Sequence, residues 1–426
     1  MKKLSFLAIA LLVTLVSCSD EKEPIIDDPE QPGVTDPEPV DPVTDLSADE
    51  MANCYIVQKE GKYKFKADNQ FNLGDGLPVP PQIHPVSAVL VWQSVKSSIN
   101  SVELVDADTD PYVVVDVAKA EGNALVAVLD KDGKIEWSWH IWMPAVEIDA
   151  IPTSTGYEIM NMNLGAMNNT PGDVLSYGLL YQWGRKDPFT ASPTLTGTLS
   201  TVGAPVYDID NNEVEFANSS WTSMADNTIA YSISHPTVVL SNYSQYATSR
   251  DWLKAELSDD ALWGNPDGDY REQGTFNYPN SGSKTCYDPS PAGWRVAPAD
   301  AFSDFTDTHA YAWEFDQFNV ADSNNDGLID INDFNYGWHF NVNDKTALYF
   351  PAATRYDGSY AMLMGTMSGL WGNYWSNAPY KSINGGAFCA LSFQVKSQTG
   401  AEMITISPSG GSSRADAFSI RCIRAQ

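Results

Sequence analysis

The chain has 426 residues, and its 25 Lys and Arg residues against 55 Asp and Glu residues give a formal net charge of −30. Hydrophobic residues make up 43% of the sequence, which is enough for packed cores. At roughly 100–200 residues per domain, the length predicts two or three domains. Phosphate binding needs Lys and Arg to displace counterions, and the sequence has no basic tract, so the composition excludes nucleic acid as a partner.

The first 17 residues predict a secretion signal. A positively charged start, Met1-Lys2-Lys3, precedes an apolar run over residues 4–16 that is too short to span a membrane. Leu15-Val16-Ser17-Cys18 resembles the bacterial lipobox, whose cysteine is acylated and becomes the first residue of the mature chain. We therefore expect lipid on Cys18 and outer-membrane lipid as a partner. The alternative is an ordinary signal peptide with a chance cysteine.

Residues 18–50 are predicted to be an acidic, proline-rich tether. Residues 19–50 hold 12 acidic residues and one Lys, whereas residues 51–426 hold 43 acidic and 22 basic residues. Charge repulsion and proline keep such a segment extended and without a core. Ser19-Asp20-Glu21-Lys22-Glu23 resembles the signal that sends lipoproteins of Bacteroidetes-type bacteria to the outer face of the outer membrane. The expected location is the cell outer membrane, lipid-anchored, on the extracellular face.

Residues 51–147 are predicted to form an immunoglobulin-like antiparallel β-sandwich. Short strand-like segments separated by glycine-containing turns are typical of this class. The segments are 54–57, 62–66, 88–92, 102–104, 112–117, 124–129 and 135–142. Ile135, Trp137, Trp139 and Ile141 share one strand face, which favours core packing over a platform for stacking sugars.

Residues 148–426 are predicted to form a β-rich α+β domain with long loops. Aromatic-rich segments alternate there with stretches of Gly, Asn and Ser, and few segments have a helical pattern. We expect helices over 176–185 and 250–261, the second with an apolar face made of Trp252, Leu253, Leu257 and Leu262. Residues 387–424 are rich in strand-forming residues.

Motifs in both regions resemble known families. Ala52-Asn53-Cys54-Tyr55-Ile56-Val57, 122–127 and 137–142 resemble the N-terminal module of fimbrillin-like Bacteroides surface lipoproteins. The segments 163–166, 178–189, 287–296, 374–376 and 418–424 resemble the Fibrobacter succinogenes major paralogous domain. The resemblance covers about residues 52–424. It implies a C-type-lectin-like or formylglycine-generating-enzyme-like fold for residues 148–426, and it implies no established reaction.

Four cysteines remain besides Cys18: Cys54, Cys286, Cys389 and Cys422. Export permits disulfides, and four cysteines allow three pairings. The resemblance brings the segments of Cys286 and Cys422 together and favours a bond between them, with buried free thiols as the alternative. The family usually has Cys where Ser290 stands here, so a disulfide that uses that position is not expected.

Residues 322–333 fit a twelve-residue calcium loop. Oxygen-bearing side chains occupy positions 1, 3, 5, 9 and 12, a backbone carbonyl serves position 7, and Gly327 at position 6 allows the sharp turn. The predicted ligands are Asp322, Asn324, Asp326, Leu328, Asp330 and Asp333. The loop differs from an EF-hand in three ways: position 12 is Asp, the sequence has no second copy of the loop, and no helix pattern follows it. We expect a structural Ca²⁺ ion, with an acidic surface turn as the alternative.

The sequence contains no catalytic motif. The five His are well separated, and no zinc-binding, nucleophile-elbow or phosphate-loop spacing occurs. Trp371, Tyr374 and Trp375 lie in a Gly/Asn/Ser-rich stretch and are candidate ligand-contact aromatics, although Trp375 in the core is an equal alternative. No residue is therefore assigned a catalytic role.

These observations predict a non-catalytic surface adhesin or binding protein. One form of this prediction is a fimbria-associated subunit. Its candidate partners are a glycan, host matrix or fimbrial subunits. Three alternatives remain: a glycan-binding component of a polysaccharide-utilisation system, an enzyme on a formylglycine-generating-enzyme-like fold, and a pilus stalk subunit. The complete strand count of the first region disfavours the stalk subunit.

Overall fold

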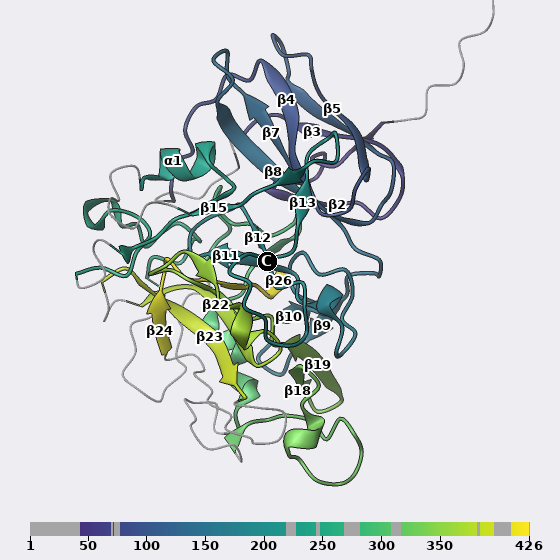
Figure 1. The fold of residues 1–426 in the computed structure, drawn as a ribbon, viewed down its shortest axis with the longest axis vertical. Coiled ribbons are helices and arrows are strands. Elements are labelled where there is room, and N and C mark those ends of the chain that lie inside the picture. The colour runs from purple at the N-terminus through teal and green to yellow at the C-terminus, as the bar shows by residue number, and fades with distance from the viewer. Residues whose placement is uncertain are drawn as a thin grey trace, which may run out of the picture. The chain divides into compact units, whose positions relative to one another are not determined.

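The computed structural model describes residues 43–69, 71, 77–218, 227–243, 248–267, 282–307, 317–380, 384–395 and 410–425. The predicted signal, the lipidation site Cys18 and the tether up to residue 42 lie outside these residues. The chain is β-rich, with 37% strand and 8% helix, and has several sheets (Figure 1). Within the described ranges, no helix has the length and apolar character needed to cross a membrane.

Two sheets dominate the first folded region. A four-stranded sheet has the order β1 (Thr44–Asp45), β3 (Gly61–Lys66), β6 (Tyr112–Val117) and β5 (Ile99–Val105). A six-stranded sheet has the order β14 (Glu213–Val214), β13 (Val206–Tyr207), β4 (Ser87–Gln93), β7 (Gly122–Leu129), β8 (Ile135–Met143) and β2 (Cys54–Ile56). All seven predicted strand segments are confirmed as β2 to β8.

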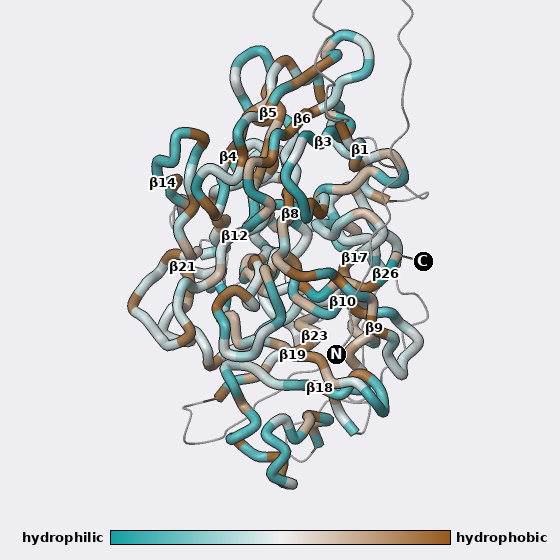
Figure 2. Tube along the Cα trace, turned by 90° about the vertical axis from the view of Figure 1, so that its right-hand side faces the viewer, coloured by the Kyte–Doolittle hydropathy of each residue, from teal (hydrophilic) through white to brown (hydrophobic). Residues whose placement is uncertain are grey.

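The inner faces of these two sheets pack against each other. Burial alternates along β6, and hydrophobic and hydrophilic stretches alternate near β4, β5 and β6 in Figure 2. Phe65 of β3 has its ring centroid 4.8 Å from that of Tyr55 on β2 and 5.3 Å from that of Trp139 on β8. The arrangement is consistent with a β-sandwich.

The six-stranded sheet includes a hairpin that the sequence did not predict. Strands β13 and β14 come from residues 206–214, far along the chain, and Tyr207 pairs with Gln93 at the edge of β4. The Gln93 side chain donates to the Asp208 carbonyl at 3.0 Å, and Asn211 bonds Ser97. The edge of β4 is therefore covered by a segment of the second region.

The second region contains three further groups of strands. An eight-stranded sheet has the path β12 (Phe189–Thr190), β11 (Leu179–Gln182), β25 (Ala417–Ser419), β22 (Trp371–Tyr380), β23 (Gly386–Gln394) and β24 (Gly410–Ser413), and it also includes β20 (Tyr356–Asp357) and β21 (Met362–Leu363). A four-stranded sheet has the order β17 (Trp294–Val296), β26 (Cys422–Arg424), β10 (Glu158–Met160) and β9 (Ala150–Pro152). Strands β18 (Gly337–Asn343) and β19 (Thr346–Pro351) form a hairpin, and β15 (Ala217–Asn218) pairs with β16 (Val238–Val239).

Both predicted helices are wrong. Residues 179–182 form β11, which pairs with β25, and the chain enters and leaves this strand through Gly178 and Gly184 at φ of 72° and 85°. Within 250–261 the only helical turn is the 3₁₀ turn η3 (Ala255–Leu257). The α-helix that the structure does contain in its described part is α1 (Ile229–Ser234).

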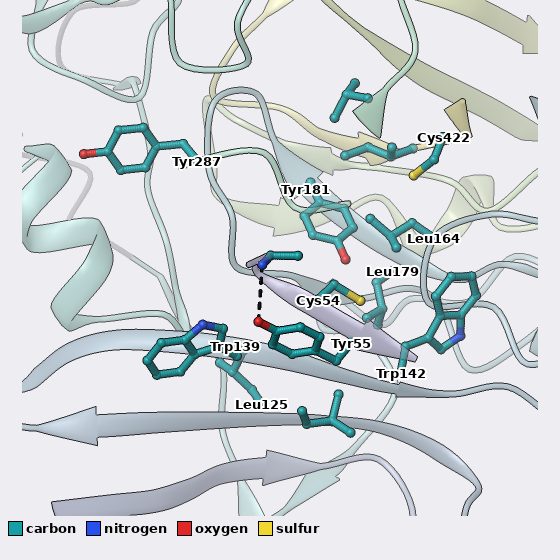
Figure 3. Close-up of a cluster of buried hydrophobic side chains, with 14 of the residues drawn as sticks. Cys54, Tyr55, Leu125, Trp139, Trp142, Leu164, Leu179, Tyr181, Tyr287 and Cys422 are labelled. Atoms are coloured by element: carbon teal, nitrogen blue, oxygen red, sulfur yellow. Dashed lines mark hydrogen bonds between the residues drawn. The ribbon is translucent and has the colours of Figure 1, made fainter. Parts of the chain in front are cut away.

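The two predicted folded regions share one hydrophobic core. Residues 41–426 form a single compact unit, so the predicted boundary at 147/148 falls inside it. Figure 3 shows Cys54 and Trp142 of the first region in one buried cluster with Leu164, Leu179 and Tyr181 of the second. Strand β8 is buried from Trp137 to Met143, because its second face is covered by residues of the second region.

Candidate functional sites

The predicted calcium loop forms a tight turn. Gly327 has φ 86°, and the Asp322 carboxylate accepts from the backbone N–H groups of Asp326 at 3.2 Å and Gly327 at 2.8 Å. The Asn324 side chain also accepts from the Asp326 N–H, at 2.8 Å, and Asp326 accepts from Leu328 at 2.9 Å. The first half of the loop is thus ordered by its own side chains.

Asp333 closes the second half of the loop. Its carboxylate is buried and accepts from the N–H groups of Ser323 at 2.7 Å, Asn324 at 3.2 Å and Asp330 at 3.0 Å. Asp330 in turn caps the 3₁₀ turn η6 (Ile331–Asp333). In the described part of the chain, no group of three His, Cys, Asp or Glu side chains gathers closely enough to hold a metal. The residues therefore fit the turn of a calcium loop, while their carboxylates do not converge on one point.

The candidate ligand-contact aromatics lie mainly in the core. Tyr374 and Trp375 are fully buried, which for Tyr374 corrects the expectation that it is exposed. For Trp375 this is the core alternative that the sequence left open: its ring stacks on Phe418 with centroids 4.1 Å apart, and its Nε1 donates to the Tyr181 carbonyl at 2.8 Å. The Tyr374 hydroxyl donates to the Pro351 carbonyl at 2.7 Å. Trp371 is half-buried, and the Arg355 guanidinium lies 5.3 Å from its ring centroid.

The other described tryptophans form no surface platform either. Of the thirteen Trp residues, Trp221 and Trp313 lie outside the described ranges, and all but Trp371 of the rest are buried. Trp139, on the predicted aromatic face of β8, packs in the core, as the sequence predicted. In the part of the chain that the structure describes, every tryptophan except the half-buried Trp371 therefore supports packing and offers no stacking surface for a ligand.

The four described cysteines are free and buried. Cys286 and Cys422 are not bonded to each other, which corrects the favoured pairing. The Cys286 Sγ lies 3.5 Å from the Pro78 carbonyl, and the Cys422 Sγ lies 3.2 Å from the Ser290 Oγ. Burial raises the pKa of Cys286, Cys389 and Cys422 to about 12, so these thiols stay protonated and are poor nucleophiles.

Several of the motif residues that carry the family resemblance join the two regions. The Asn53 side chain donates to the carbonyls of Cys286 at 2.7 Å and Asp288 at 2.9 Å, and it accepts from Trp137 Nε1 at 3.0 Å. The Trp142 Nε1 donates to the Ala166 carbonyl at 2.7 Å. Asn53 and Trp142 therefore belong to an internal junction and do not line an open site.

A buried ion pair lies at the same junction. The Lys186 Nζ lies 2.8 Å from the Asp187 carboxylate, with side-chain exposures of 2% and 4%, and it also donates to the Ser138 carbonyl at 3.0 Å. The Ser138 hydroxyl donates to Asp187 at 2.6 Å. Burial lowers the pKa of Lys186, and the carboxylate of Asp187 opposes that shift. This fully enclosed, mutually satisfied group connects β8 to the segment of Lys186 and is closed to a substrate.

His140 also belongs to the junction. Burial lowers its pKa to about 3, so the imidazole is neutral, and its Nε2 lies 2.8 Å from the Asn123 side-chain oxygen. The Asn123 amide nitrogen donates across to the Gly165 carbonyl at 2.9 Å. A neutral, enclosed imidazole cannot exchange protons with a ligand in solvent.

Three of the surface hollows in the described part of the chain differ in their chemistry. One of 330 Å³ lies between the two regions and is mainly apolar, with Val95, Leu175 and Leu179 in its wall. A second of 330 Å³ is lined by Asp259, Asp260, Tyr380, Asn384 and the buried Arg414, whose guanidinium bonds Asp260 and lies 3.3 Å from Asp251. A third of 500 Å³, beside β18, has only polar residues in its described wall. Sequence reasoning missed all three, because each is assembled from distant segments.

Comparison of the chain with protein-family models, with curated proteins and with solved structures finds no significant match.

Proposed function

We propose that this protein is a lipid-anchored surface protein of the outer membrane that binds a ligand without catalysis, as an adhesin. The observation that carries the proposal is the order of its parts. A lipobox-like Cys18 is followed by an acidic, proline-rich segment, and then by one compact unit over residues 41–426. This order suits a protein that displays a folded binding unit away from a membrane.

The arrangement of ionisable groups supports binding over catalysis. Enzymes place groups with shifted pKa in an accessible pocket. Here Lys186, His140 and the cysteines have shifted pKa values and lie in enclosed, structural surroundings. The ligand of an adhesin of this kind is a glycan, host matrix or a fimbrial subunit.

We also propose the finer fold and cofactor assignments as hypotheses. Residues 51–147, with two sheets packed through Phe65 and Trp139, are proposed to be immunoglobulin-like. The α+β character and the lectin-like or formylglycine-generating-enzyme-like fold of residues 148–426 rest on the motif resemblance. Calcium in the 322–333 loop rests on its spacing and on the turn at Gly327.

Three measurements test the proposed function. Metabolic labelling with palmitate should label the wild-type chain and leave Cys18→Ala unlabelled, and protease added to intact cells should digest the wild-type protein. The full chain in detergent should then bind at least one member of an array of glycans and matrix proteins. Absence of lipid from the wild-type chain would contradict the proposed anchor. Absence of binding to every member of the array would contradict the proposed binding function.

A further inference from the structure

In the described part of its wall, the hollow beside β18 is lined only by polar residues. Its volume is 500 Å³, which lies in the range of small-ligand sites. The lining residues are Ser154, Asp304, Thr306, Asp307, Asn319, Asn341, Asn343 and Asp344. Each of these side chains carries at least one oxygen that can accept a hydrogen bond, and the three amides also donate.

The strand that forms one wall departs from ordinary strand chemistry. Trp338, Phe340 and Val342 face the core, and Asn341 and Asn343 alternate with them on the open side. Asn is depleted in strands, where a β-branched residue would be the stable choice. The pairing with β19 also shifts register between Asn341 and Asn343. Bulges of this kind redirect side chains and occur near functional sites. The regular pairing of the strand is therefore interrupted where the hollow lies.

The amide side chains are held in fixed positions before any ligand arrives. The Asn341 Nδ2 donates to the Asn319 Oδ1 at 2.7 Å, and the Asn319 Nδ2 donates to the Asp304 carbonyl at 2.8 Å. The Asn343 Nδ2 donates to the Pro152 carbonyl at 2.6 Å. Each amide nitrogen carries two protons and each of these bonds uses one, so a donor remains on each. Fixed donors and acceptors lower the entropy cost of binding.

The chemistry of the wall selects one ligand class. The described lining residues include three carboxylates and no Lys or Arg, and this negative charge disfavours anionic ligands. The absence of apolar residues from this described lining disfavours lipids and aromatic ligands. A bare cation is disfavoured because no three carboxylates or imidazoles converge within the described residues. Hydroxyl groups, which donate to carboxylates and both donate to and accept from amides, match this wall.

We propose that the hollow beside β18 is the ligand site and that it binds a neutral, hydroxyl-rich glycan. The inference rests on the proposed binding function and deepens it by naming the site and the ligand class. Asn319, Asn341 and Asn343 position the sugar hydroxyls through donors and acceptors. Asp307 and Asp344 accept hydrogen bonds from sugar hydroxyls at the exposed rim.

The test uses the full chain in detergent on an array of neutral and anionic oligosaccharides together with matrix proteins. The strongest glycan is then titrated by calorimetry against wild type, Asn341→Leu and Asp344→Ala. Leu has the same number of side-chain heavy atoms and the same branching as Asn and cannot hydrogen-bond, and the exposed Asp344 can be truncated without disturbing the core. The matched control is Asn100→Leu, an exposed strand Asn on β5 outside the hollow. Thermal melting establishes that each variant is folded.

The expected result is binding of neutral glycans in preference to sulfated or uronate-containing ones. Asn341→Leu should weaken that binding by about tenfold or more, since a paired polar group is lost, and Asn100→Leu should leave it unchanged. Equal glycan affinity of wild type and both hollow variants would overturn the site, and a preference for anionic glycans would overturn the ligand class. Binding to matrix proteins alone would reject the glycan inference and leave the adhesin function standing, whereas no binding at all would reject both.

Discussion

Asp416 is buried, and its carboxyl group is a weaker acid than an ordinary Asp. Its side chain is 11% exposed, and burial raises its pKa from 3.8 to about 6 although the Arg355 guanidinium, 3.6 Å away, opposes the shift. The carboxylate also accepts from the Gly358 N–H at 2.8 Å. Between pH 4 and 6 the folded protein therefore holds a proton that the unfolded chain has released.

This proton predicts a pH-dependent stability. For a carboxyl whose pKa is raised by folding, the stabilisation is complete below the unfolded pKa and is lost as the pH rises through about 6. From pH 4 to 6.5 we expect the free energy of unfolding of wild type to fall by about 2 kcal/mol relative to Asp416→Asn. Urea unfolding at both values measures this, with the exposed Asp132→Asn as control. Parallel stability profiles of wild type and Asp416→Asn would contradict the prediction.

Single residues also mark what the sequence could and could not reveal. The burial of Trp137 and Trp139 could be predicted from their alternation along one strand. The roles of Asn53 and Lys186 could not, because their partners lie 235 and 48 residues away along the chain. The burial of Trp375 was open, since a Gly/Asn/Ser-rich neighbourhood suits a surface loop as well as a strand in a crowded sheet.

Among the secondary-structure elements, short strands were predictable and the helices were not. The strands of the first region alternate between buried and open faces, and that period is visible in the sequence. The run at 179–183, apolar except for Gln182, has no clear period, so its length and its flanking glycines, Gly178 and Gly184, are the better guide. At 250–261 the Asp251 side chain accepts from the Leu253 N–H at 3.0 Å, and it replaces a helical hydrogen bond.

The loop at 322–333 leads to a prediction about calcium. If calcium occupies the loop, it stabilises the folded state by mass action, by about 2.7 kcal/mol at a concentration 100 times its Kd. For a chain of this size that free energy raises the Tm by several degrees. Thermal melting should show a higher Tm with calcium than with EDTA for wild type and no difference for Asp326→Ala.

A matched acidic turn and a second variant complete this test. Asp208 organises the turn at 208–212 through similar bonds from Asp210 and Asn212, so Asp210→Ala should keep the calcium response. Asp333→Ala should lower the Tm even in EDTA, because three backbone N–H groups lose their buried acceptor. Identical melting of wild type in calcium and in EDTA would show that the loop is a surface turn closed by its own hydrogen bonds.

At the scale of the whole molecule, the packing of residues 51–147 against residues 148–426 is the main feature that could not be predicted from the sequence. Composition and strand spacing suggested a separate sandwich, and they contain no information about which outer face is covered. In the structure β8 is buried on both faces, and β13 from the second region extends the sheet beyond β4. The junction bonds of Asn53, Asn123 and Lys186 are all enclosed.

This join predicts that the first region does not fold alone. A fragment of residues 43–147 would expose Trp142, His140 and Ser138, and it would leave Asn53 without its acceptors at Cys286 and Asp288. We expect this fragment to lack a cooperative thermal transition, since unpaired polar groups and exposed tryptophan each cost stability. Residues 43–426 should melt cooperatively under the same conditions. A sharp transition and well-dispersed amide signals in the isolated fragment would contradict the shared core and would restore the first region as an independent domain.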